Sequence, residues 1–156
     1  MAAGDESMTL CLGSAGEIVR ILTAQTTARC KVFQIEGKSN AAAMRPGVEV
    51  VSCASWGTRM DHFLAGDGFI FFHGAEGTKA HLVPVLAHIK KKAARATAGQ
   101  KKAAPPPRVP RIALVNWLPT ELRDLRAFMG IGTEDFWFYK FRNIKDAFVF
   151  VQNTAQ

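Results

Sequence analysis

The stretch GFIFFHGAEGTKAHLVPVLAHIKKKA, residues 68–93, decides the fold. It opens with an apolar run at 68–72, passes through a glycine turn and ends in a helical pattern over 78–92. A run without polar alternation predicts a strand that lies centrally in its sheet and is covered on both faces. Pro84 predicts an interruption or kink in the helix, because proline lacks the N–H that a helix interior uses. The order of strand, turn and helix is typical of a βα unit in a parallel sheet.

The rest of the chain alternates short apolar runs with amphipathic stretches in the same way. Further strands are expected at 8–14, 31–37, 48–54, 112–117 and 147–153, and further helices at 16–28, 59–67 and 119–130. This alternation predicts a single α/β domain: a Rossmann-like, doubly wound, mostly parallel sheet with helices on both faces. The domain is expected to consist of 1–89 and 112–156, separated by a basic insertion at 90–111.

The composition is that of a globular protein of one domain. Of the 156 residues, 48% are hydrophobic and 21% are charged, a balance that excludes a disordered chain. No apolar run reaches the roughly 18 residues of a membrane-spanning helix, and residues 1–8 resemble neither a secretory signal nor a transit peptide. Cys11, Cys30 and Cys53 form no CxxC pair and are expected to be buried small hydrophobes. We therefore expect an intracellular protein of a reducing compartment, cytoplasmic or, if the chain is a processed form, mitochondrial.

All of the excess positive charge lies in one segment. The formal net charge is +7, yet residues 90–111 hold 8 of the 20 basic residues and none of the 13 acidic ones. An acid-free basic segment on a neutral domain suits a polyanion, because phosphate contacts release counterions. RNA is the expected partner; acidic tubulin tails or lipids share this chemistry, and a solvated surface loop is the alternative. The basic residues of the segment are Lys90, Lys91, Lys92, Arg95, Lys101, Lys102, Arg108 and Arg111.

The glycine turn has features of an anion site. Gly74, Gly77 and Thr78 lie between a strand and a helix, so free N–H groups and the helix dipole would point at a phosphate. The alternative is a tight turn that binds nothing. His81 is placed either for general acid–base chemistry or for capping and packing on the first helical turn.

Two other groups of residues have features of a metal site and of a base-stacking surface. His73, His81 and His88 have a spacing that can gather a metal, but no Cys or carboxylate completes the set, so we expect no metal and no cofactor. The segment DFWFYKFRN, residues 135–143, interleaves aromatic and basic side chains, as in proteins that stack nucleic-acid bases. Core packing or an aromatic dimer interface explains the same segment, and we favour it.

Several motifs together resemble the lonely-guy-type nucleoside 5′-monophosphate phosphoribohydrolases, once called lysine decarboxylases. TRMDHFLAGDGFIFFHGAEGTKAH (58–81) is similar to that family's signature, which ends in Pro-Gly-Gly-x-Gly-Thr-x-x-Glu. IALVNWLPTELRDLRAFM (112–129) and IKDAFVFVQNT (144–154) are similar to its later elements, and residues 8–37 to its first phosphate loop. The resemblance implies a doubly wound α/β fold, a homodimer, and cleavage of an N-glycosidic bond.

The chain departs from the family at its catalytic positions. The family's Arg-Lys pair falls on Thr58 and Arg59, the final Glu becomes His81, and the first βα unit has no counterpart. The resemblance therefore implies Arg59 and His81 as catalytic residues only in altered roles. Phosphate-binding positions carried over from the family are Gly13, Ser14, Gly16, Gly74, Gly77 and Thr78.

Three functions follow from these observations. The first is a diverged, catalytically impaired phosphoribohydrolase-like domain, kept as a structural or RNA-contacting component of a larger, ribosomal or mitochondrial, assembly. The second is an active enzyme that releases free base and ribose 5-phosphate from a nucleoside 5′-monophosphate. The third is a protein that binds a nucleotide without cleaving it. The altered signature and the basic insertion favour the first.

Overall fold

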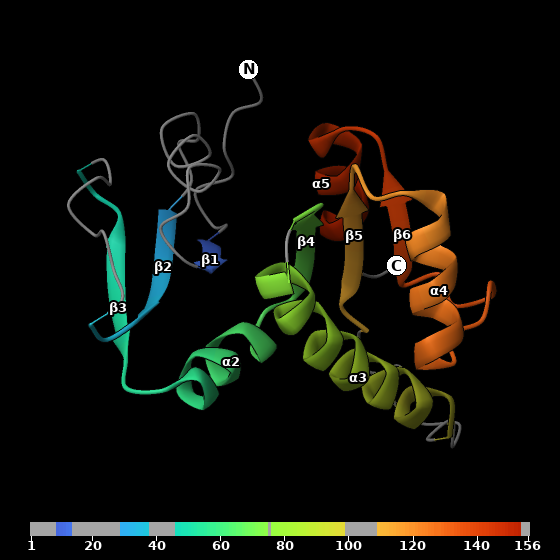
Figure 1. Cartoon of the computed structure of the whole chain (residues 1–156), viewed down its shortest axis with the longest axis horizontal. Coiled ribbons are helices and arrows are strands. Elements are labelled where there is room, and N and C mark those ends of the chain that lie inside the picture. The colour runs from blue at the N-terminus through green and yellow to red at the C-terminus, as the bar shows by residue number, and fades with distance from the viewer. Residues whose placement is uncertain (1–8, 14–28, 38–45, 75, 99–108, 154–156) are drawn as a thin grey trace. The chain divides into compact units, whose positions relative to one another are not determined.

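The strands and helices of this chain fall into two units. A computed structural model describes residues 9–13, 29–37, 46–74, 76–98 and 109–153, of which 9–13 by backbone alone. The first unit ends at Ala65 and the second begins at Gly66. Each unit holds a three-stranded sheet, in the orders β1-β2-β3 and β4-β5-β6 (Figure 1). The predicted α/β fold with parallel strands is confirmed, and the described strands form two sheets.

The first unit packs one helix on its sheet. Its strands are all parallel, with Val32 of β2 paired to Leu12 of β1 and Val50 of β3. The helix begins after Ser55, whose side-chain oxygen accepts a hydrogen bond from the Thr58 N–H at 3.2 Å. The elements are β1 Thr9–Gly13, β2 Arg29–Ile35, β3 Glu49–Cys53 and α2 Trp56–Leu64. The helix expected at 16–28 lies outside the described residues.

Aromatic side chains and buried cysteines form the core of the first unit. Phe33 of β2 stacks on the His62 ring of α2 at 4.7 Å and meets the Phe63 ring edge-on at 5.7 Å. Cys30 and Cys53 are 2% and 0% exposed and form no disulfide with each other. The expectation that they are buried small hydrophobes is confirmed for these two, while the side chain of Cys11 lies outside the described part of the chain.

The second unit repeats a strand followed by a helix three times. Its strands are parallel, and their last paired residues, Phe72, Val115 and Phe141, lie side by side. In this sheet β5 is the central strand, so the prediction that 68–72 lies centrally is wrong. The elements are β4 Gly68–Phe72, α3 Glu76–Ala98, β5 Arg111–Val115, α4 Pro119–Met129, β6 Phe138–Phe141 and α5 Ile144–Gln152.

Helix α3 is longer than expected and continues through Pro84. It runs to Ala98, so the first part of the basic segment is helical. Its apolar stripe is fully buried: Leu82, Val85, Leu86 and Ile89 are at most 1% exposed. Each such side chain contributes roughly 1.5–3 kcal/mol on burial. Packing on both sides of the proline outweighs the hydrogen bond that it removes, and the predicted interruption is wrong.

The last element is a helix, whereas the sequence predicted a strand at 147–153. Asn143 caps α5 by accepting a hydrogen bond from the Asp146 N–H at 2.9 Å. Ala147 and Val151 then lie one turn apart, and both pack against the core formed by Ala113 of β5. The strand that closes the sheet is β6, inside the aromatic segment 135–143. None of the described helices combines the length and the apolar character needed to cross a bilayer.

Candidate functional site

The carboxyl edge of the second sheet is where the fold gathers polar side chains. Strands β4, β5 and β6 end next to one another, and each is followed by a short turn and a helix. His73, Asn116 and Arg142 directly follow the three strands, so they lie at the same edge. Ligands of open α/β sheets bind outside the carboxyl ends of the strands. This edge is therefore the candidate site of the second unit.

His73 is held at this edge by backbone and ring contacts. Its N–H donates to the Val115 carbonyl at 2.9 Å, which continues the pairing of β4 with β5. Its ring meets the Trp117 ring edge-on at 5.5 Å. Trp117 is 2% exposed and donates its indole N–H to the Phe71 carbonyl at 3.1 Å. A buried, hydrogen-bonded tryptophan thus forms one wall for the imidazole.

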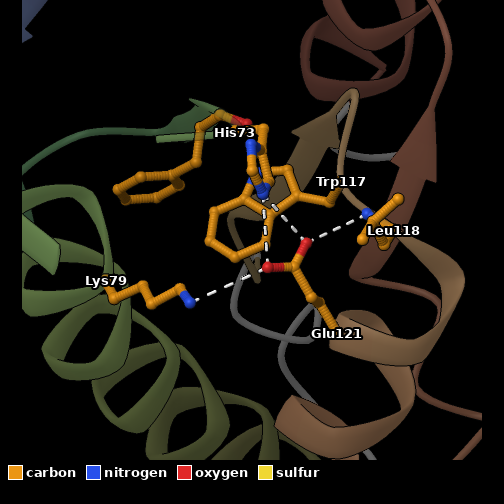
Figure 2. Close-up of polar contacts among 6 residues, drawn as sticks. His73, Lys79, Trp117, Leu118 and Glu121 are labelled. Atoms are coloured by element: carbon orange, nitrogen blue, oxygen red, sulfur yellow. Dashed lines mark hydrogen bonds and ion pairs between the residues drawn. The ribbon is translucent and has the colours of Figure 1, made fainter. Parts of the chain in front are cut away.

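Glu121 links the start of α4 to this histidine. Its Oε2 accepts a hydrogen bond from the Leu118 N–H at 3.1 Å, as in the capping of a helix N-terminus. His73 Nε2 lies 3.2 Å from Oε1 and 3.1 Å from Oε2, and Lys79 Nζ lies 3.7 Å from Oε1 (Figure 2). The Leu118 hydrogen bond lowers the pKa of Glu121 below its ordinary value, and His73 and Lys79 lower it further.

This arrangement is a carboxylate that orients an imidazole. When His73 Nε2 carries the ring proton, it donates a hydrogen bond to Glu121. The Nδ1 lone pair is then left as an acceptor. The described residues offer Nδ1 no hydrogen-bond partner, and the His73 side chain is 45% exposed. An imidazole base oriented by a carboxylate is the part of a catalytic site that takes the proton from a water or a hydroxyl. The nucleophile itself is the other part. The same contacts also have a structural use, because they fix the first turn of α4.

The predicted phosphate turn is partly explained by packing. A Cβ at Gly74 would collide with the side-chain oxygen of Thr78, so a larger residue here would force the Thr78 side chain to shift. Gly77 has open space around its Cα, and its carbonyl lies 2.7 Å from His81 Nδ1. His81 thus turns one ring nitrogen toward the backbone of its own helix. Gly13 ends β1, whereas Ser14 and Gly16 lie outside the described residues.

Arg59 occupies an unusual place in the first unit. It is 6% exposed, and its guanidinium lies 5.9 Å from the Trp56 ring and 5.7 Å from the Phe63 ring. Burial lowers its pKa, an effect that Cys53 partly offsets. Within the described residues, its Nε and Nη2 have no hydrogen-bond acceptor. Buried arginines are nearly always paired, so these donors would suit an anion. Its predicted partner in catalysis, His81, belongs to the second unit.

The basic residues of 90–111 separate into two groups. Lys90 Nζ donates to the Met129 carbonyl at 2.7 Å, and Arg111 donates to the Phe150 carbonyl at 3.3 Å, so both serve the fold. Lys91, Lys92 and Arg95 have no salt bridge to the described acids. Lys101, Lys102 and Arg108 lie outside the described residues.

Lys91, Lys92 and Arg95 lie close to His88 on α3. Burial lowers the pKa of His88, and the charges of Lys92, Lys91 and Arg95 lower it further. The four residues fall within two turns of α3, so they share one stretch of helix surface. We name Lys91, Lys92 and Arg95 the α3 cationic face. Among the described residues, no three His, Cys, Asp or Glu side chains gather as a metal site would require.

The sequence motifs did not single out Glu121, Lys79 or Trp117. A signal was present, because the residues after the carboxyl ends of neighbouring parallel strands meet at one edge. His73 follows β4, and Glu121 lies in the first turn of the helix after β5, 48 residues later. Comparison with protein-family models, with curated proteins and with solved structures gave no match.

Proposed function

We propose that this chain is a diverged, non-hydrolytic domain of the phosphoribohydrolase type that contacts RNA within a larger assembly. The observation that carries the proposal is the α3 cationic face. Lys91 and Arg95 are exposed and one helical turn apart, and Lys92 is half-buried beside them. Phosphates of a nucleic acid would supply the anions that the described residues do not. The buried free thiols Cys30 and Cys53 suit a reducing compartment.

The helix dipole does not account for these cations. Cations near a helix C-terminus are stabilising, but the effect falls off within the last turn. Arg95 lies in the last turn of α3, which ends at Ala98, whereas Lys91 and Lys92 lie a turn earlier. Packing does not account for them either, because the buried stripe of α3 is formed by other residues. An external anion would explain why three cations lie together, and a solvated helix surface is the alternative.

Size fractionation of a native lysate tests the assembly. The protein should travel with large particles and should move to small fractions after ribonuclease treatment. Deleting 90–110 would remove the end of α3 together with the charges, so charge replacement is the cleaner perturbation. Lys91→Gln, Lys92→Gln and Arg95→Gln together should shift the protein to small fractions. A wild-type protein that travels at its own size, with or without ribonuclease, would contradict the proposal.

Hydrolysis of a nucleoside 5′-monophosphate is the second candidate, and the His73–Glu121 pair favours it. Cleavage of the N-glycosidic bond requires water to be deprotonated as the sugar becomes oxocarbenium-like. His73 Nδ1 is available for that proton, and Glu121 would stabilise the resulting imidazolium.

Release of adenine from AMP by the purified protein distinguishes this candidate. The second candidate predicts steady turnover that His73→Gln abolishes, and that His88→Gln, a matched change on α3, leaves intact. The first candidate predicts no turnover by the wild type. An AMP-dependent rise in melting temperature without adenine release would instead support a protein that binds a nucleotide.

A further inference from the structure

Three aromatic rings of the second unit form a connected surface beside α5. Tyr139 and Phe141 are two residues apart on β6, so they point to the same side of the sheet. Their centroids are 5.5 Å apart, and the Phe150 ring of α5 lies 6.3 Å from Tyr139 and 5.1 Å from Phe141. We name these three residues the aromatic strip. Tyr139 and Phe141 belong to the segment 135–143, for which core packing or an aromatic dimer interface is the favoured explanation.

Core packing explains only part of that segment. Trp137 and Phe138 are 8% and 0% exposed, as the core interpretation expects. Tyr139 is 57% exposed, and Val149 nearby on α5 is 51% exposed. β6 is the outer strand of the described sheet, so Tyr139 stands at the rim of the fold. A single exposed ring needs no explanation, but one that continues a ring cluster offers a ready surface for stacking.

Positive charge lies next to the aromatic strip. The Arg111 guanidinium lies 5.0 Å from the centroid of the Phe150 ring. Lys140 leaves β6 on the side opposite to Tyr139. After β6 the chain carries the exposed cations Arg142 and Lys145 against one acid, Asp146, whose carboxylate accepts from the Asn143 amide at 2.8 Å. Exposed rings among cations are the pattern with which proteins bind single-stranded nucleic acids, the rings stacking bases and the cations contacting phosphates.

We propose that Tyr139 stacks an unpaired base of single-stranded RNA, with the exposed cations Arg142 and Lys145 contacting the flanking phosphates. This inference rests on the proposed RNA-binding function and adds a second contact, distinct from the α3 cationic face. A second copy of the chain is the less favourable occupant. A two-fold interface brings the same patch against itself, and here it would gather Arg142 and Lys145 of both copies in one interface.

Fluorescence anisotropy with two labelled probes tests the stacking. One probe is a short oligouridylate and the other is an abasic oligonucleotide of the same length, which keeps the phosphates and lacks the bases. Tyr139→Ala should weaken oligouridylate binding by about 5- to 150-fold, since one stacked base contributes roughly 1–3 kcal/mol. It should leave abasic binding unchanged. Tyr139→Phe keeps the ring and should bind both probes as the wild type does.

The outcomes separate the stacking from the function on which it rests. If the wild type binds both probes and Tyr139→Ala loses neither, or loses both equally, stacking is refuted and RNA binding stands. If the wild type binds neither probe, both proposals fail. Sedimentation of wild type and Tyr139→Ala supplies the last check. A dimer that this substitution dissociates would assign the strip to contacts between copies and overturn the inference.

Discussion

Neutralising the α3 cationic face should change the salt dependence of RNA binding by a calculable amount. The perturbation is the triple variant Lys91→Gln, Lys92→Gln, Arg95→Gln. These side chains lack a described salt-bridge partner, and Lys91 and Arg95 are exposed, so the fold should tolerate the change. Glutamine keeps the helix propensity and much of the side-chain length.

The expected magnitude follows from the number of phosphate contacts. For single strands the slope of log affinity against log salt changes by about 0.7 for each phosphate neutralised, so three contacts give a difference of about 2. A slope difference of 2 makes the wild type gain about 16-fold more affinity than the variant on dilution from about 200 to 50 mM salt. The assay is anisotropy titration of a labelled oligouridylate at four or more salt concentrations.

A matched triple variant separates the location of the charge from its amount. Arg29→Gln, Lys31→Gln and Arg123→Gln remove the same total charge from other places; Arg29 and Arg123 are exposed, and Lys31 pairs with Glu49. This control should keep most of the wild-type slope. Equal slopes for the two triple variants would refute the α3 cationic face as the binding surface, because net charge alone would then account for the affinity.

Three further changes test the site and the core. Glu121→Gln should make the unfolding free energy less sensitive to acid. A carboxyl whose pKa is lowered by folding stabilises the protein above its unfolded pKa, near 4.5. This stabilisation is lost as the pH falls through the lower pKa of the folded state. Urea denaturation between about pH 3 and 6 should therefore give an unfolding free energy that depends less on pH in the variant. Parallel pH curves for wild type and variant would show that the Leu118 hydrogen bond and the His73 and Lys79 contacts do not lower the pKa of Glu121 in solution. Arg59→Met should raise the melting temperature by removing a buried charge whose Nε and Nη2 have no acceptor among the described residues, and should abolish any stabilisation by AMP; a large loss of stability would mean that the guanidinium has a structural acceptor. Phe138→Ala should cost about 3–5 kcal/mol of unfolding free energy by chemical denaturation, because Phe138 is fully buried, and a loss below about 1 kcal/mol would contradict the described core.

The sequence was sufficient for elements that combine pattern with clear ends. The strand at 68–72 is an uninterrupted apolar run bounded by glycine and histidine, and it is β4 with the same limits. The helix expected at 119–130 is α4, whose αL cap is Gly130 with φ of 59°. In both cases a residue typical of an element's end follows the apolar pattern, so both signals predict the same boundary.

The strand predicted at 147–153 is helix α5, and β6 was not predicted, because local pattern is ambiguous in short apolar runs. AFVFVQN fits a buried strand or a buried helix equally well. The deciding residue is Asn143, which lies before the window and caps α5. Within the aromatic segment, the buried Phe138 lies next to the exposed Tyr139. One buried and one exposed neighbour is what the two faces of an outer strand give.

Only part of the candidate site could be predicted from the sequence. The glycine turn could be predicted, because its residues are neighbours in the chain. The link between His73 and Glu121 spans 48 residues and exists only once β4 and β5 pair in register. Likewise, nothing in the lysine run distinguished Lys90, which binds the Met129 carbonyl, from Lys91 beside it. The direction in which a side chain leaves the helix decides that difference.

Because α3 continues to Ala98, the cations at 91–95 are carried by an ordered backbone. Ordering a backbone costs roughly 1–2 kcal/mol for each residue that is fixed on binding. The folded helix meets that entropic cost before any ligand arrives. A solitary peptide of the same sequence should therefore bind RNA more weakly than the intact chain, even though it presents identical charges.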